Sequence, residues 1–218
     1  KIKSVKVHGY DESVNILNET IGTKGYSFVK IKTSVENKNE GLLDLVFGIE
    51  EGQKSYIGSI NISGNTRTLD YVIRRELKLL EGDPFNAQKL KESIKSIRRL
   101  GYFTSVDVDL KATDTDNKVD INISVKETLT GDFAFGIGYD SVEKEQFSIG
   151  LNEKNFLGKG LKTKLNVTTS AKSTKYDVGI TEPYFQDKPL LLSGNIFDQS
   201  NERGDREIDK TGLNFAFG

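Results

Sequence analysis

The residues of this sequence that could carry out chemistry are few. There is one histidine, His8, and there is no cysteine. A lone histidine on an expected strand is far more often a surface residue than a general base or a metal ligand, and a Ser–His–Asp triad built on it would be a coincidence. The absence of cysteine excludes thiolate nucleophiles, disulfides and thiolate metal sites. The sequence therefore predicts a protein that is not an enzyme.

Two other patterns resemble ligand sites but have simpler explanations. Five aspartates lie close together, at Asp107, Asp109, Asp114, Asp116 and Asp120. Their alternation along two expected strands spreads them over a solvent-facing surface, and the segment lacks the central glycine of a calcium loop. The stretch Gly136–Gly138 is not a phosphate-binding loop, because no helix follows it. We therefore expect no metal and no cofactor.

Charge and hydropathy exclude two further classes of protein. Lys and Arg number 31 against 32 Asp and Glu, a net charge of −1, so there is no basic surplus with which to bind nucleic acid. No apolar run is long enough for a spanning helix. The chain begins at Lys1 without a signal segment and contains no methionine, which indicates a piece of a longer, processed protein.

The elements that position the remaining residues are clearest between residues 54 and 128. An alternating strand over Tyr56–Ser63 ends at a Gly64-Asn65 turn. Thr68 is expected to cap a first helix that ends at Gly82. The apolar stripe of that helix consists of Leu69, Val72, Ile73, Leu77 and Leu80.

A second helix and two strands complete this region. Asn86 can cap the helix and Gly101 ends it. Its apolar stripe consists of Ala87, Leu90, Ile94, Ile97 and Leu100. The strands Val106–Leu110 and Val119–Val125 alternate with period two. The order β-α-α-β-β, with two amphipathic helices over one face of a small sheet, predicts an α+β domain.

Residues 1–53 repeat the second half of this unit. A helix is expected at Val14, Ile16, Leu17 and Ile21, followed by strands over Phe28–Val35 and Leu43–Ile49. The stretch Lys24–Phe28 aligns with Leu100–Phe103, and such internal repetition indicates a second copy of the same unit. Lys3–His8 could be its opening strand, but too few residues remain before Val14 for a first helix. This copy is therefore expected to be partial or to lack residues.

After Thr130 the sequence becomes a series of alternating segments without helices. In the first segment, Gly131–Asp140, one face carries Phe133, Phe135, Ile137 and Tyr139. The other face carries Ala134, Gly136 and Gly138. The segments that repeat this pattern are Phe147–Leu151, Leu161–Val167, Tyr176–Ile180, Leu190–Ile196 and Leu213–Phe217. Antiparallel strands with one apolar and one small or polar face are typical of a transmembrane β-barrel, and residues 129–218 would be its first five to six strands.

Motifs along nearly the whole chain resemble one family. Those in the central region resemble a POTRA domain: Ile62–Thr66, Arg74–Leu77, Glu81–Asn86 and Arg99–Phe103. Later stretches are similar to the POTRA-to-barrel junction of the BamA family of outer-membrane protein assembly factors: Val125–Thr128, Gly131–Tyr139, Asn155–Gly160 and Thr181–Phe185. The resemblance implies a partial POTRA domain over residues 1–53, a complete last POTRA domain over 54–128, and a truncated β-barrel over 129–218.

The resemblance also implies a location, a role and partners. It implies a Gram-negative outer-membrane protein with periplasmic POTRA domains, and a core component of the BAM complex. Such a protein folds and inserts client β-barrel proteins. Its expected partners are outer-membrane assembly lipoproteins, unfolded β-barrel clients and outer-membrane lipid, but no nucleic acid.

Three sets of residues would carry this role in the family. The barrel seam is the strand Gly131–Asp140, with Phe133, Phe135, Gly136, Ile137, Gly138 and Tyr139. Its weak pairing would let it template client strands, although small residues on its inner face also simply prevent crowding. Lipoprotein docking falls to Arg75, Glu76 and Glu81, which could equally be a solvated helix end. The POTRA edge that would accept an extended peptide is Val106, Val108 and Leu110, unless its charges keep peptides away.

Two alternatives remain open on the sequence alone. A two-partner secretion transporter also joins POTRA domains to a barrel, but it exports one passenger protein. A passive porin-like barrel would conduct through a polar lumen instead. The number of POTRA domains separates the first alternative from an assembly factor, and single-channel conductance separates the second.

Overall fold

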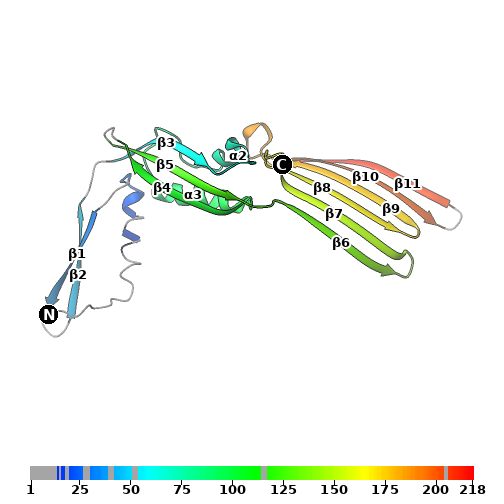
Figure 1. Ribbon diagram of the computed structural model, residues 1–218, viewed down its shortest axis with the longest axis horizontal. Helices are drawn as coiled ribbons and strands as arrows, with labels where there is room; N and C mark the ends of the chain where they lie inside the picture. Colours follow the sequence, from blue (N-terminus) through cyan, green and yellow to red (C-terminus); the bar gives the residue numbers. More distant parts are fainter. Residues whose placement is uncertain are drawn as a thin grey trace. The chain divides into compact units, whose positions relative to one another are not determined.

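The computed structural model describes residues 14, 16, 17, 20–26, 30–38, 42–50, 54–113, 117–203 and 206–218. The chain divides into two compact units. The first unit comprises Lys1–Ser63, Glu76–Arg99 and Val106–Val125, and the second comprises Gly64–Arg75, Leu100–Ser105 and Lys126–Gly218. Three separate sheets account for all the strands in the described ranges (Figure 1).

A two-stranded sheet opens the described part of the chain. β1 (Lys30–Lys38) pairs antiparallel with β2 (Leu42–Glu50). Helical residues precede it at positions 14, 16, 17 and 20–22, where the sequence predicts a helix. The predicted opening strand Lys3–His8, and with it His8, lies outside the described residues.

The complete α+β module is built around a three-stranded sheet in the order β3-β5-β4. Its strands are β3 (Tyr56–Ser63), β4 (Phe103–Ala112) and β5 (Lys118–Glu127), and its helices are α2 (Asp70–Arg74) and α3 (Ala87–Arg99). The chain order β-α-α-β-β is the predicted one. β3 and β5 run parallel with a register shift between Ile57 and Ile60, and the Ser59 amide left over there donates to Asp120 Oδ1 at 2.7 Å.

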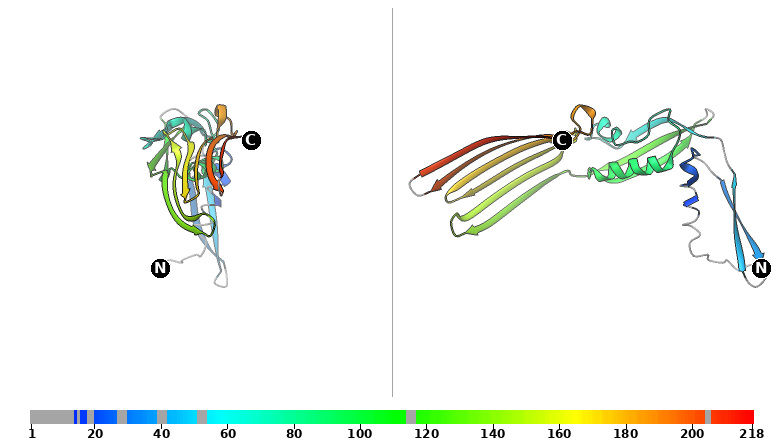
Figure 2. Two further views of the ribbon diagram at one scale, coloured as in Figure 1. Left: turned by 90° about the vertical axis from the view of Figure 1, so that its right-hand side faces the viewer. Right: turned by 180° about the vertical axis from the view of Figure 1, so that it is seen from behind.

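Alternating apolar residues of this sheet form the core of the first unit. The side chains of Ile57, Val106, Val119, Ile121 and Ile123 are 0–2% exposed. Helix α3 runs alongside the sheet (Figure 2) and contributes buried Ile94 and Ile97. Each such side chain stabilises the fold by about 1.5–3 kcal/mol. The period-two and period-3.6 patterns of the sequence therefore identified most of this core.

The second predicted helix is confirmed, together with its cap. The side-chain Oδ1 of Asn86 accepts a hydrogen bond from the Lys89 amide at 2.9 Å, which satisfies one of the amides that a helix start leaves unpaired. Two polar residues, Ser93 and Ser96, are buried on the inner face besides Ile94 and Ile97. Ser93 is tolerated there because its hydroxyl donates to the Lys89 carbonyl at 2.7 Å.

The first predicted helix is much shorter than expected, and its predicted cap is wrong. α2 spans Asp70–Arg74, and its N-cap residue is Leu69, without a side-chain capping bond. Thr68 cannot cap it because other partners use its polar groups. Its amide donates to Glu127, and its hydroxyl accepts a bond from Asn155.

The predicted apolar stripe also fails after Ile73. The amide of Lys78 donates to Ser93 Oγ at 2.8 Å, and the amide of Leu80 donates to Asp83 Oδ2 at 3.0 Å, so neither makes a helical bond. This irregular backbone buries Leu79 and leaves Leu80 68% exposed. Helical periodicity placed the buried position one residue too late.

The third sheet has six antiparallel strands in chain order and belongs to the second unit. They are β6 (Gly131–Asp140), β7 (Lys144–Phe156), β8 (Leu161–Ser170), β9 (Ser173–Glu182), β10 (Leu192–Arg203) and β11 (Arg206–Phe217). A short helix, η1 (Phe185–Asp187), lies between β9 and β10. The sheet is visibly curved (Figure 2). No helix among the described residues is long and apolar enough to cross a membrane.

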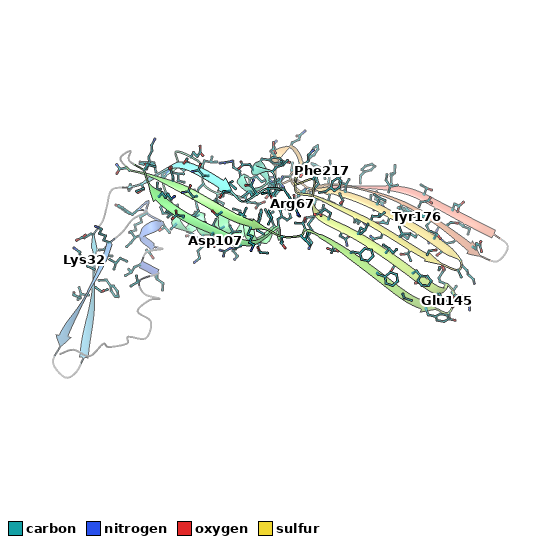
Figure 3. All side chains as sticks on the ribbon, in the orientation of Figure 1. Lys32, Arg67, Asp107, Glu145, Tyr176 and Phe217 are labelled. Atoms are coloured by element: carbon teal, nitrogen blue, oxygen red, sulfur yellow. The ribbon has the colours of Figure 1, made fainter. Side chains whose placement is uncertain are left out.

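Side chains along these six strands alternate between the two faces (Figure 3). One face is apolar and exposed: Phe135 is 60%, Tyr176 49% and Phe215 78% exposed. Polar side chains on the other face form hydrogen bonds between strands. For example, Asn195 Nδ2 donates to Asp177 Oδ2 at 3.0 Å. The predicted run of antiparallel strands with one apolar face is confirmed.

Candidate functional site

The outer strand β6 is the first part of the candidate site. It pairs with β7 in one continuous register, from Gly131 opposite Glu153 to Asp140 opposite Lys144, and no described strand lies on its other side. The amide of Lys154 donates to the Thr130 carbonyl at 3.2 Å. This bond sets the alternation of the ladder, since hydrogen-bonded and non-bonded pairs take turns along antiparallel strands.

The alternation divides the predicted seam residues into two sets. Because Thr130 is hydrogen-bonded to β7, every second residue after it also directs its N–H and C=O toward β7. Gly136 and Gly138 belong to this set. The backbone groups of Phe133, Phe135, Ile137 and Tyr139 then point away from β7, and their side chains are 60–70% exposed. The apolar residues therefore carry the open edge, whereas the two glycines hold β6 to its neighbour.

Gly136 leaves room for a side chain of the neighbouring strand. A Cβ atom at this position would lie 2.4 Å from Ser148 Oγ, so the Ser148 side chain would have to turn away. The small residues on this face thus leave room for polar side chains of β7, in accordance with the simpler of the two readings of these glycines. That reading and the open edge are compatible, because they concern different groups of the strand.

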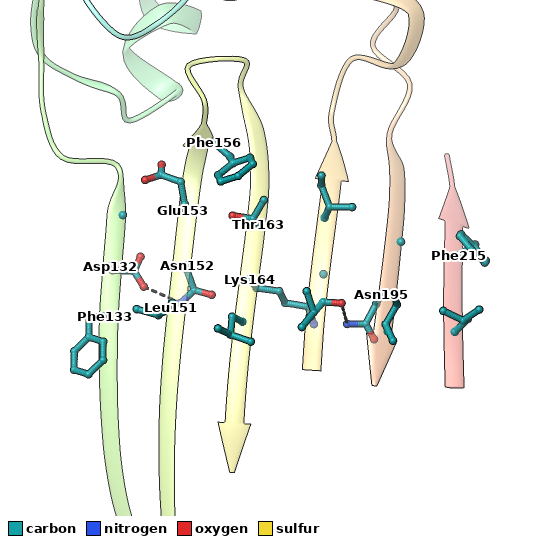
Figure 4. A pocket seen from close by; sticks show the side chains of 18 residues that line it. Asp132, Phe133, Leu151, Asn152, Glu153, Phe156, Thr163, Lys164, Asn195 and Phe215 are labelled. Carbon is teal, nitrogen blue, oxygen red and sulfur yellow. Dashed lines mark hydrogen bonds between the residues drawn. The ribbon is translucent and has the colours of Figure 1, made fainter. Parts of the chain in front are cut away.

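A trough of about 870 Å³ crosses the sheet near Gly131, and all six of its strands contribute residues (Figure 4). Asn152 Nδ2 donates to Asp132 Oδ2 at 2.8 Å, which ties β6 to β7. Lys164 pairs with Asp177 at 2.8 Å, which ties β8 to β9. These cross-strand bonds stiffen the sheet at the end where β6 begins.

The second part of the candidate site is a polar cluster around Glu127, at the end of β5. Its Oε2 accepts bonds from Thr66 Oγ1 at 2.8 Å and from the Arg67 amide at 2.9 Å. Its Oε1 accepts a bond from the Thr68 amide at 2.7 Å. Burial raises the pKa of Glu127, but the hydrogen bonds from Thr68, Thr66 and Arg67 outweigh burial and lower the pKa to about 2. The carboxylate therefore fixes the segment before α2.

The same segment is attached to the turn between β7 and β8. Asn155 Nδ2 donates to Thr68 Oγ1 at 2.9 Å, and Asn155 Oδ1 accepts a bond from the Gly160 amide at 2.8 Å. The amide of Leu69 donates to the Gly158 carbonyl at 2.9 Å. Gly158 has φ +71°, and a Cβ atom there would lie 2.0 Å from the Arg67 carbonyl oxygen, so only glycine fits. Residues 67–69 and 155–160 are therefore in direct contact within the second unit.

The predicted docking residues have contacts of their own. The guanidinium of Arg75 lies over the Tyr184 ring, 4.1 Å from its centre, and 5.8 Å from the centre of the Tyr71 ring. Glu81 Oε1 accepts a bond from the Ile60 amide at 2.9 Å. Glu76 is half-buried. Arg75 and Glu81 thus have structural contacts that the sequence did not indicate.

The two outer strands of the three-stranded sheet differ in how far they are covered. Residues 81–84 lie along β3, where the Ile57 amide donates to the Asp83 carbonyl and the Gly82 amide to the Ile57 carbonyl, both at 2.9 Å. On β4, Arg98 Nη2 donates to the Val106 carbonyl at 2.8 Å. Val106 is buried, whereas Val108 and Leu110 are half-buried. The predicted edge β4 is thus an outer strand with one acceptor already in use.

Known proteins similar to this chain share one family. The POTRA model (surface antigen variable number repeat) matches residues 55–128, and the Omp85 superfamily domain matches residues 155–218. The outer membrane protein assembly factor BamA of Nitratidesulfovibrio vulgaris is 30% identical over 183 residues, covering 84% of this chain and 23% of that protein. The protein of that name from Neisseria meningitidis serogroup B is 30% identical over 186 residues, with the same shares. The crystal structure of BamA from Haemophilus ducreyi lacking POTRA domains 1-3 has a TM-score of 0.81 at 27% identity and covers 99% of this chain and 42% of that one.

The chain belongs to the BamA/Omp85 family. It spans about a quarter (23%) of the length of the curated relatives that it matches. Membership makes it an outer-membrane protein whose POTRA domain lies in the periplasm. The predicted fold class, a POTRA module followed by antiparallel barrel strands, is confirmed.

Two residues of this BamA/Omp85 site were missed at the sequence level, Glu127 and Asn155, and Thr68 was expected only as a helix cap. Glu127 and Asn155 stand inside motifs that carry the family resemblance, but neither belongs to a charge cluster or an apolar stripe. Two patterns could have indicated them. Glu127 stands at the end of an alternating strand, and Asn155 precedes a turn with glycines at 158 and 160. Their contacts span up to 87 positions of the sequence, which no local pattern reveals.

Replacement of Glu127 by Gln should loosen the segment before α2 in this BamA/Omp85 chain. The amide group keeps one acceptor oxygen and turns its NH₂ toward backbone donors. We expect amide exchange at Arg67 and Thr68 to rise about tenfold or more, since bonds to a charged group are worth about 1.5–3 kcal/mol. Hydrogen exchange of the detergent-solubilised protein measures this effect. Glu92→Gln, which alters an exposed pair with Lys78, should leave these two amides unchanged.

The same variant tests the pH dependence. The Glu127 pKa is lowered from 4.5 to about 2 in the folded protein, so its contribution is complete above pH 4.5 and is lost as the pH falls toward about 2. Protection of Arg67 and Thr68, corrected for intrinsic exchange, should fall over this range in the parent protein. The profile of Glu127→Gln should lack this step, and an identical acid profile in both proteins would show that Glu127 is not the group responsible.

Proposed function

We propose that this chain takes part in folding client β-barrel proteins and inserting them into the outer membrane. Unfolded β-barrel chains would be its substrates, and assembly lipoproteins and outer-membrane lipid its partners. Two relatives that are 30% identical to this chain are named outer membrane protein assembly factor BamA. The proposed division is a partial POTRA domain over residues 1–53, a complete one over 54–128, and barrel strands over 129–218.

The observation that carries the proposal is the outward edge of β6. Phe133, Phe135, Ile137 and Tyr139 direct backbone donors and acceptors away from β7. In the hydrocarbon region of a membrane, each such group costs several kcal/mol unless it is hydrogen-bonded. An incoming client strand supplies the missing partners in register. Templating of this kind needs neither ATP nor a covalent intermediate, which agrees with a protein that is not an enzyme.

Docking in the periplasm would use the POTRA module. β4 is the strand to which an extended client segment would add, and Val108 and Leu110 offer backbone positions beyond the one that Arg98 occupies. Glu76 and Glu81 would face lipoprotein partners. Arg75 would contribute indirectly, because its guanidinium packs on Tyr184.

Proline at Ile137 tests the templating edge with the least disturbance of the strand itself. The substitution removes an N–H that points away from β7, a position at which an edge strand tolerates proline. Client assembly should fall about fivefold, the equivalent of one hydrogen bond of about 1 kcal/mol, while the protein itself still inserts. The measurement is the amount of a reporter barrel protein assembled in cells that produce the full-length variant.

Gly136→Pro is the matched control on the same strand. It removes an N–H that faces β7 and should lower the amount of folded protein itself. In addition, a cysteine at Gly138 should crosslink to a stalled client. Normal client assembly with Ile137→Pro, together with no adduct at Gly138 under folding conditions, would contradict the seam role.

Replacement of Glu81 by Lys tests lipoprotein docking. If the carboxylate faces a partner, co-purification of the lipoproteins should fall by up to about fivefold, the equivalent of an exposed ion pair of about 1 kcal/mol. Glu81→Gln separates docking from structure, because it removes the charge but keeps an acceptor for the Ile60 amide. Loss of partners in both variants supports docking. If the lipoproteins still co-purify with Glu81→Lys, or are lost from Glu81→Lys but not from Glu81→Gln, Glu81 serves only to hold the segment that covers β3.

A further inference from the structure

Besides the Glu127 carboxylate, two contacts with the six-stranded sheet hold the segment Gly64–Arg75, and both lie within the second unit. The first joins residues 66–69 to the β7–β8 turn and centres on Asn155; we call it the Asn155 contact. The second joins Arg75 to Tyr184, just after β9; we call it the Arg75 contact. They attach the same short segment to two different turns of the six-stranded sheet.

The Asn155 contact is saturated with hydrogen bonds. Thr68 is 2% exposed and Asn155 is 8% exposed. The side chain of Asn155 both donates to Thr68 and accepts from Gly160. Its own amide donates to Glu153 Oε1 at 2.7 Å. Opening this contact would leave several buried polar groups without partners, which is costly, so the contact resists opening.

The Arg75 contact is built in the opposite way. Within the described part of the chain, Nε and Nη2 of Arg75 are buried without a hydrogen-bond partner. Burying two such donors costs more than a single cation–π contact with Tyr184 returns. The space beside the guanidinium depends on Gly160, where a Cβ atom would lie 2.4 Å from Nη2. The contact is therefore only weakly held.

The turn that carries Tyr184 is itself strained. Gln186 and Asp187 adopt φ +56° and +57°, a left-handed conformation that is unfavourable for a residue with a Cβ atom. The turn is closed by its own bonds, since the Phe185 amide donates to the Leu190 carbonyl at 2.9 Å. Leu191 and Gly218 also exchange backbone bonds, at 2.7 and 3.0 Å. Contact with Arg75 supports this strained turn, so the amides of the turn open more often once the contact is lost.

We propose that the Asn155 contact is a permanent attachment and that the Arg75 contact is a releasable one. The turn over residues 183–191 can leave the end of α2 while residues 66–69 stay bound to the β7–β8 turn. Release lets the Arg75 donors reach water or an acidic group. This asymmetry is a property of the second unit and does not rest on the proposed function.

Hydrogen exchange of the detergent-solubilised protein at natural length tests the proposal amide by amide. Tyr184→Leu should raise exchange of the Phe185 and Leu190 amides about 2- to 30-fold, the equivalent of a cation–π contact of about 0.5–2 kcal/mol. Exchange of the Leu69 and Gly160 amides, which report the Asn155 contact, should not change. Tyr184→Phe keeps the ring and should keep most of the protection of the Phe185 and Leu190 amides.

Two further variants complete the design. Gly158→Ala, which forces a Cβ atom against the Arg67 carbonyl, should open the Leu69 and Gly160 amides. Tyr71→Leu removes the more distant ring on the same guanidinium and should leave Phe185 unchanged. If Tyr184→Leu opens Leu69 and Gly160 as much as Phe185, the two contacts form one rigid unit and the proposal is wrong. If Tyr184→Leu raises the exchange of none of these amides, the Arg75 contact does not stabilise the turn, and the proposal fails as well. Arg75→Lys supplies the same comparison should Tyr184→Leu not fold.

Discussion

The carboxylate of Glu127 gathers three donors from three consecutive residues, and the arrangement of the second unit follows from this interaction. The Arg67 and Thr68 amides donate to this carboxylate and not to a helical carbonyl, and α2 begins only after Leu69. Thr68, held by its amide, then presents its hydroxyl to Asn155. Asn155 in turn closes the turn that ends β7. A single acidic residue thus determines where a helix starts and which turn it meets.

The periodic parts of this chain could be predicted from its sequence, because their cause is local. Strands β4 to β11 alternate, and alternation needs no knowledge of the partner strand to be recognised. The cap at Asn86 belongs to the same class, since donor and acceptor are three residues apart. The helix expected over residues 69–80 failed because its backbone amides bond to Ser93 and to Asp83 instead. Such competition depends on tertiary contacts and leaves no mark in the apolar period.

The candidate site shows the same division between local and distant causes. That Phe133 and Gly136 lie on opposite faces follows from period two, and the sequence predicted it. Which of them turns its backbone toward β7 depends on the Thr130–Lys154 pair, a matter of register between strands. The bonds of Thr68, Glu127 and Asn155 join residues far apart in the chain, and the sequence could only suggest them through family motifs. The contacts of the docking residues could not be predicted for the same reason, because Arg75 packs on Tyr184, which follows six strands later in the chain.

Because residues 81–84 cover β3, a further strand can be added to the POTRA sheet only at β4. With β3 covered, two copies of the module could join edge to edge only through their β4 strands. Such a pair would use the same backbone positions as an incoming peptide, so self-association and peptide capture exclude each other. Crowding of these modules at the membrane would then lower the number of open edges, and an arriving peptide would have to separate the copies. By covering β3, residues 81–84 thereby limit the module to one added strand at a time.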